Sequence, residues 1–250
     1  MPEMLVSALA VPGLVWLVSG ALVAGVVRGF AGFGTAMIYL PVAGQFLSPF
    51  EALTTLICMD LIGPIPNVPR ALRDGDQSDL VRLGTGLVFG VPIGVYALSL
   101  VAPEVFRYGV STIAIILLVL LISGVRYSRQ LPGRMIVATG GLGGILAGST
   151  GLPGPPVIML YMASKHPPQV IRANSMLYLL TADFVMLGVL ALFGHLVISA
   201  IGLGLVLAVP YLLGNLAGAA IFNPAREKVY RVAAYSIIAI SAINGLPLFD

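Results

Sequence analysis

The sequence predicts an all-α membrane protein made of two inverted repeats, each a re-entrant helical hairpin plus three transmembrane helices. Three observations lead to this fold class. The 250 residues are 58% hydrophobic and only 9% charged, whereas soluble domains carry about 25% charged residues. Apolar runs of roughly 20 residues, long enough to cross a bilayer, recur along the chain. A glycine-broken apolar segment occurs twice.

The glycine-broken segment is the clearest internal repeat. Three glycines match at a constant offset of 119 residues, at positions 25, 29 and 32 and again at 144, 148 and 151. Pro49 and Pro168 match at the same offset. We therefore predict a first repeat at residues 1–130 and a second at 131–250, which together form one integrated transmembrane bundle.

Each repeat is expected to contain the same elements in the same order. An apolar arm runs into the glycine break and a second arm leaves it, at 13–28 and 35–46 in the first repeat and 135–147 and 155–163 in the second. At 1.5 Å per residue these arms span roughly 14–24 Å, short of the ~30 Å hydrocarbon core, which predicts re-entrant hairpins. Three helices follow each hairpin, at about 50–66, 80–102 and 106–125, then 170–193, 196–222 and 228–246.

The positive charges predict the orientation, because cytoplasmic loops are enriched in lysine and arginine. If each hairpin returns to its own side, every basic loop falls on one side, both termini lie outside, and the repeats are inverted. Counting each hairpin as two crossings gives the same result, whereas counting it as one broken span separates the loops. The basic loops contain Arg70, Arg73 and Arg82, then Arg126, Arg129 and Arg134, then Lys165 and Arg172, then Arg226, Lys228 and Arg231.

The composition also limits the partners. A net charge of +3 without a basic stripe does not suggest nucleic acid. The lone Cys58 excludes an intrachain disulfide and a cysteine metal cluster, and we expect no metal and no cofactor. The first residues lack the basic start of a signal peptide, so we expect no cleavage. The expected partners are the lipid bilayer and a small anionic substrate, and a homo-oligomer is left open.

The two glycine breaks are the candidate substrate site of a secondary transporter, because glycine- or proline-interrupted apolar segments at matching places in two halves mark such sites. Glycine-rich turns present N–H groups, and the helix N-termini that follow attract anions. The alternative is that these glycines only allow close helix packing. We expect one oxyanion between the two hairpin tips, near the bilayer midplane. The predicted substrate-binding residues are Arg28, Gly29, Gly32, Gly34, Thr35, Gly148, Ser149, Thr150, Gly151, Gly154, Asn174 and Ser175.

Three charged residues adjoin or lie inside apolar segments, where ionisable groups are functional candidates. Arg28 adjoins the first break and could attract the anion or, alternatively, extend to the interface. Asp60 and Asp183 are predicted proton-coupling residues, and a structural hydrogen bond between helices is the alternative role for each.

Other function classes are weighed against transport. An anion or cation channel would use the same polar cavity. The run from Gly148 to Gly151, taken with His195, suggests an intramembrane hydrolase, but Thr150 stands where such serine proteases need their serine. We therefore do not expect an enzyme.

The residues 25–41 (GVVRGFAGFGTAMIYLP) and 144–160 (GILAGSTGLPGPPVIML), with 49–56 and 168–177, resemble the two signature repeats of the TauE/SafE family. These are sulfite exporters and toluene-sulfonate uptake permeases, and the resemblance covers essentially the whole chain. It implies a multi-pass transporter of the bacterial inner membrane for sulfite, sulfoacetate or a sulfonate, driven by an ion or proton gradient or by simple flux. Arg28 and the proline-rich second turn depart from the family pattern.

Overall fold

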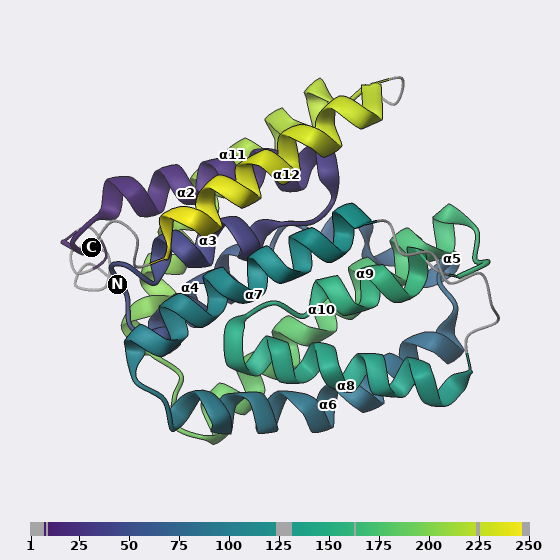
Figure 1. Cartoon of the computed structure of the whole chain (residues 1–250), viewed down its shortest axis with the longest axis horizontal. Coiled ribbons are helices and arrows are strands. Elements are labelled where there is room, and N and C mark those ends of the chain that lie inside the picture. Colours follow the sequence, from purple (N-terminus) through teal and green to yellow (C-terminus); the bar gives the residue numbers. More distant parts are fainter. Residues whose placement is uncertain (1–7, 9, 124–131, 163, 224–225, 247–250) are drawn as a thin grey trace. The chain divides into compact units, whose positions relative to one another are not determined.

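The structure is a computed structural model that describes the chain except for residues 1–7, 9, 124–131, 163, 224–225 and 247–250 (Figure 1). The regular secondary structure of the described residues is entirely helical, which confirms the predicted all-α class. The helices are α2 (Leu14–Ala31), α3 (Thr35–Ala43), α4 (Pro49–Asp60), η1 (Ile65–Asn67), α5 (Val68–Asp74), α6 (Gln77–Ser99), α7 (Pro103–Ser123), α8 (Gly133–Thr150), α9 (Gly154–Met162), α10 (Pro168–Leu192), α11 (Ile198–Ile221) and α12 (Glu227–Asn244). The predicted basic positions Arg126 and Arg129 lie outside the described residues.

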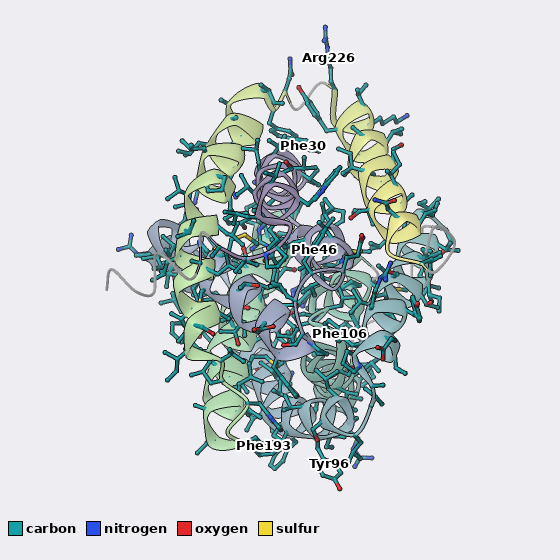
Figure 2. All side chains as sticks on the ribbon, turned by 90° about the vertical axis from the view of Figure 1, so that its left-hand side faces the viewer. Phe30, Phe46, Tyr96, Phe106, Phe193 and Arg226 are labelled. Atoms are coloured by element: carbon teal, nitrogen blue, oxygen red, sulfur yellow. The ribbon has the colours of Figure 1, made fainter. Side chains whose placement is uncertain are left out.

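Five helices of the described chain are long and apolar enough to cross a membrane, namely α2, α6, α7, α10 and α11. Each carries a large apolar side chain that is mostly exposed, such as Trp16, Phe89, Val119, Leu192 and Leu216. Figure 2 shows Tyr96 of α6 pointing away from the ribbon, and its exposed fraction is 60%. In a bilayer, lipid chains cover such side chains. The length and composition of these helices therefore indicate a multi-pass membrane protein.

The described chain divides into two compact units, and each unit combines segments from both predicted repeats. Unit 1 contains Met1–Gly63, Ala102–Leu118 and His195–Asp250, and unit 2 contains Pro64–Val101 and Val119–Gly194. In unit 1, α2 packs along α11, and in unit 2, α8 packs along α6 (Figure 1). The predicted division at residue 130 and the inversion of the repeats stay predictions.

Both glycine breaks occur later in the chain than the sequence suggested. α2 continues through Gly29 to Ala31, and the backbone turns at Gly32 and Gly34, with φ of 78° and 103°. α8 likewise ends at Thr150 and is followed by Gly151 at φ 70°. Glycine adopts this left-handed conformation without a steric penalty, which makes it the usual residue after a helix end. The predicted arms 13–28 and 135–147 were therefore too short.

The early glycines of the first segment lie inside α2, where they allow backbone contact with α11. A Cβ atom added at Gly25 would lie 2.2 Å from the carbonyl oxygen of Tyr211, and one at Gly29 would lie 2.2 Å from that of Asn215. Any larger residue would force the two helices apart, because these neighbours are backbone atoms. Small residues serve the same purpose in other membrane helix pairs.

The same packing recurs in unit 2. A Cβ atom at Gly144 would lie 2.8 Å from the carbonyl oxygen of Leu87, and one at Gly148 would lie 2.4 Å from that of Val91. The early glycines of both segments therefore lie in close helix–helix contacts, as the helix-packing alternative to substrate binding predicts.

The helix predicted at 50–66 ends earlier, at Asp60. Ser48 and Glu51 form a capping box at its start, and the Ser48 backbone N–H donates to Glu51 Oε2 over 2.9 Å. Downstream, Gly63 and Pro64 interrupt the helix, because proline lacks the N–H that a helix interior requires. The matched prolines of the repeat, Pro49 and Pro168, each occupy the first position of a helix, α4 and α10. Proline suits the first position of a helix, because an N–H group at that position would have no partner inside the helix.

Candidate functional site

A buried charge cluster lies next to the first hairpin turn, in unit 1. Arg28 Nη1 of α2 is 3.5 Å from Asp60 Oδ2 of α4, and each side chain is 12% exposed. The Tyr211 hydroxyl of α11 donates a hydrogen bond to Asp60 Oδ1. The same hydroxyl lies 3.4 Å from Thr35 Oγ1, at the start of α3. We call Arg28, Asp60, Tyr211 and Thr35 the charge cluster.

A second buried pair, close to the cluster in sequence, forms a hydrogen bond between α3 and α4. The Tyr39 hydroxyl of α3 donates to Thr55 Oγ1 of α4 over 2.9 Å, and Thr55 Oγ1 donates to the Ala52 carbonyl over 2.9 Å. Both side chains are fully buried. This pair fixes α3 against α4, and so helps to hold Thr35, the first residue of α3, in the cluster.

The N-terminus of α3 adds positive potential to the cluster. α3 begins at Thr35, directly after the left-handed Gly34, and no side chain caps it. The first N–H groups of a helix have no partner inside it and give its end a partial positive charge. The described residues of the first turn therefore offer two attractions for an anion: the Arg28 guanidinium and the start of α3.

The second turn offers fewer donors than the first. The hydroxyls of Ser149 and Thr150 donate within α8, to the carbonyls of Ile145 and Leu146, over 2.8 Å each. α9 begins at Gly154, and the two residues that follow are prolines, which have no N–H. At the repeat offset, Ala147 corresponds to Arg28. Ser149 and Thr150 thus use their hydroxyl hydrogens within their own helix, and their predicted part in substrate binding stays a prediction.

The other predicted substrate residues lie in varied surroundings. Asn174 is fully buried in unit 2, where its Oδ1 accepts the Asp76 N–H over 2.9 Å and its Nδ2 donates to the Tyr161 hydroxyl over 2.7 Å. Ser175 follows it on α10 and is partly buried. Gly32 is exposed, with open space where a side chain would start. Asp183, the second predicted proton-coupling residue, is partly buried on α10.

Sequence reasoning proposed Arg28 and Asp60 separately and missed both their pairing and Tyr211. A tyrosine inside a long apolar helix is the signal that could have drawn attention to position 211. The pairing itself has no sequence signal, because the two residues belong to different helices.

The all-helical fold, the five candidate spans and the buried charge cluster define a multi-pass membrane protein with an ionic site inside its helices. The chain matches the family described as Sulfite exporter TauE/SafE over residues 17–245, and it belongs to this family, as the signature repeats predicted. Neither the curated proteins nor the solved structures gave a match. The family suggests a membrane transporter of sulfur-containing anions, which is consistent with a protein that is not an enzyme.

Proposed function

We propose that this protein is a secondary transporter of the bacterial inner membrane that binds a small sulfur oxyanion, such as sulfite, sulfoacetate or a sulfonate, at the charge cluster. The observation that carries the proposal is the buried Arg28–Asp60 pair beside the uncapped start of α3. A guanidinium presents a planar fork of donors that matches the oxygens of such anions, and a helix N-terminus adds further N–H groups.

An anion suits this cluster better than a cation does. Its carboxylate, Asp60, already has Arg28 and Tyr211 as partners. A hard metal cation would need several oxygen ligands in place of a guanidinium. This charge balance favours an anion transporter over a cation channel.

Asp60 acts in the proposed mechanism as an internal anion that the substrate displaces from Arg28. The carboxylate and the substrate oxygens compete for the same guanidinium. Protonation of Asp60 would neutralise it and leave Arg28 to the substrate, so a proton and an anion would be transported together. Asp60 is therefore our first choice as the proton-coupling residue, because it contacts the group that holds the substrate, and Asp183 remains the second.

The test compares three variants in proteoliposomes and in thermal-shift titrations with sulfite, sulfoacetate, a sulfonate, a carboxylate and a set of cations. Arg28→Gln should abolish binding of the sulfur anion. Asp60→Asn removes the competitor and also the carboxylate that balances the Arg28 charge, which is costly. We expect this variant to be less stable without substrate, and to gain more from the anion than the wild type does, since a ligand stabilises the state that it binds. Arg70→Gln is the control, because Arg70 is an exposed cation of α5 with 83% of its side chain accessible.

Two results would count against the proposal. Stabilisation by cations alone would favour the channel. Unchanged anion affinity in Arg28→Gln would place the site elsewhere. Proton coupling has its own criterion, because transport by Asp60→Asn with the pH dependence of the wild type would exclude Asp60 as the proton carrier.

A further inference from the structure

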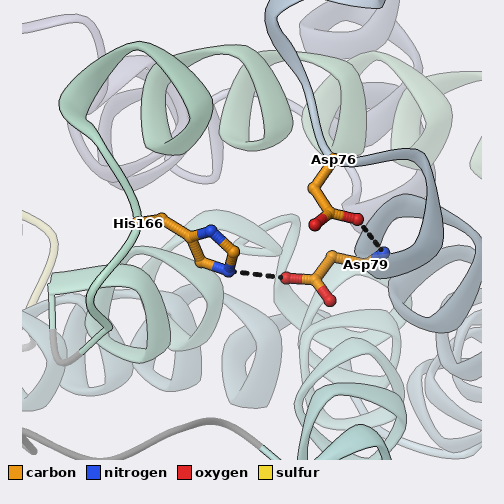
Figure 3. A group of neighbouring side chains, drawn as sticks. All are labelled: Asp76, Asp79 and His166. Atoms are coloured by element: carbon orange, nitrogen blue, oxygen red, sulfur yellow. Dashed lines mark hydrogen bonds and ion pairs between the residues drawn. The ribbon is translucent and has the colours of Figure 1, made fainter.

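Three ionisable side chains form a compact group in unit 2, where the start of α6 meets the loop between α9 and α10 (Figure 3). They are Asp76, Asp79 and His166, and one ligand atom of each lies within 4.8 Å of the others. Asp76 is the N-cap of α6, and its Oδ1 accepts the Asp79 N–H over 3.1 Å. Figure 3 shows the two carboxylates and the imidazole ring turned toward one another.

The contact between Asp79 and His166 is close without being a hydrogen bond. His166 Nε2 lies 3.2 Å from Asp79 Oδ2. Asp79 is 4% exposed, yet Oδ2 has no hydrogen-bond partner among the described residues, because a hydrogen bond also requires alignment of the donor. Two ligands of one metal ion, each at about 2.0–2.2 Å, lie roughly 2.8–3.6 Å apart. The Nε2–Oδ2 separation of 3.2 Å lies in this range, which an ion pair between the two side chains would also give.

The two carboxylates of the group lie near the positive charge of Arg82. Arg82 Nη1 lies 3.4 Å from Asp79 Oδ1, and the Arg82 side chain is 45% exposed. This leaves Oδ2 of the same carboxylate, and the carboxylate of Asp76, facing each other and the imidazole. Neighbouring carboxylates repel each other, and a buried one needs a compensating charge.

The surroundings hold these side chains in place. Asn174 accepts the Asp76 N–H over 2.9 Å and donates to the Asp76 carbonyl over 3.3 Å. The Tyr161 ring meets the His166 ring edge-on, with centroids 5.9 Å apart. Gly75 leaves room for Asn174, because a Cβ atom there would lie 2.7 Å from Asn174 Oδ1. Supporting contacts of this kind orient the ligands of metal sites.

We infer that Asp76, Asp79 and His166 bind one divalent transition-metal ion, of the class of Zn²⁺ or Mn²⁺. Two carboxylates and one imidazole suit these ions, whereas Mg²⁺ and Ca²⁺ prefer oxygen ligands alone. The ion would join the start of α6, from the first half of the sequence, to the loop before α10, from the second. It would thereby act as a structural clip that is separate from substrate chemistry.

The test uses purified full-length protein, freed of any histidine tag and stripped with a chelator. Zn²⁺, Mn²⁺ and Mg²⁺ are titrated at one neutral pH by calorimetry, with metal content and thermal stability measured in parallel. We expect about one Zn²⁺ or Mn²⁺ per chain, a raised melting temperature, and little response to Mg²⁺. Asp79→Asn and His166→Gln should each weaken the affinity by roughly tenfold or more, since loss of an outer partner alone costs 10–100-fold.

The matched control is His195→Gln, which removes a histidine whose ring stacks on Phe50. It should bind the metal as the wild type does. If Asp79→Asn fails to fold, His166→Gln decides, because its side chain projects from a loop. The inference is overturned if the wild type takes up no stoichiometric metal, or if both variants bind it unchanged. Stability of the wild type that does not respond to metal would identify the contact as an ion pair with a protonated histidine instead.

Discussion

Tyr211 donates its hydroxyl hydrogen to Asp60, so a residue of α11 completes the charge cluster of the first hairpin. The packing glycines make this contact possible. Gly25 of α2 lies against the carbonyl of Tyr211, where a Cβ atom would be only 2.2 Å from the oxygen. The close approach of α2 and α11 therefore places the Tyr211 side chain beside Asp60. Glycines that do not contact the substrate thus determine the geometry of the proposed site.

The Tyr211 hydroxyl should matter for anion binding, because it holds one oxygen of Asp60. Without it, Asp60 depends more on Arg28 and is harder to displace. We expect Tyr211→Phe to weaken sulfite binding about tenfold, equivalent to about 1.4 kcal/mol, as measured by calorimetry.

Tyr178→Phe is the matched control, because Tyr178 is equally buried and donates to the Gly140 carbonyl over 3.2 Å. It should lose some stability and keep its anion affinity. Equal affinities in the two phenylalanine variants would show that Tyr211 only packs.

The helix-packing glycines should tolerate no side chain. Gly25→Ala and Gly144→Ala each place a methyl group against a backbone carbonyl, so we expect markedly lower melting temperatures in detergent. Gly188→Ala on α10 is the control, because nothing lies within 4 Å of its added Cβ atom. Alanine is favoured over glycine in a helix by roughly 0.5–1 kcal/mol, so this variant should be as stable as the wild type or more so. Normal stability of Gly25→Ala would contradict the close packing of α2 on α11.

The sequence was sufficient for the helical class and for the long apolar helices α6, α7, α10 and α11, because each depends on local patterns. α2, which was predicted as a re-entrant arm, is itself long and apolar enough to span, and α4, which was predicted as a full crossing, has only 12 residues. Apolar runs predict membrane helices, and prolines such as Pro49 and Pro168 mark helix starts. The positions of the breaks were less accurate, since Gly29 and Gly148 resemble turn residues until their packing partners are known. A glycine in a helix and a glycine in a turn have the same local sequence signal.

The partners of the charged residues could not be predicted, because they come from distant parts of the chain. Arg28 and Tyr211 both contact Asp60, and the three residues lie on three separate helices. Asp79 and His166 come together only where the loop before α10 reaches the start of α6. A single sequence carries no information on such pairs beyond the presence of each residue.

The hydroxyls of the two turns should contribute unequally to anion binding. Thr35 lies in the charge cluster at the start of α3, whereas Ser149 donates to a carbonyl of its own helix. We expect Thr35→Val to weaken sulfite binding roughly 5–10-fold, the scale of one lost hydrogen bond. Ser149→Ala should have little effect, as measured in the same titration. A larger effect of Ser149→Ala would restore the second turn as a principal part of the site.

The orientation of the chain follows from its basic loops and can be tested by labelling single cysteines in a Cys58→Ala background. We expect both termini outside, six full crossings and two opposed re-entrant hairpins, so the loops around Arg73 and Lys165 both face the cytoplasm. Arg73→Cys and Lys165→Cys suit the experiment because both residues are exposed, whereas a side chain at Gly75 would meet Asn174. Both should react with an impermeant maleimide only in inside-out vesicles, while Glu104→Cys, at the exposed start of α7, should react in intact cells. α2 is long enough to span by its length and composition. If each hairpin crosses only once, Arg73 and Lys165 would label from opposite sides, because α6 and α7 return the chain to one side and the α8–α9 pair then adds a single crossing. That result would replace the re-entrant hairpin by a single broken span.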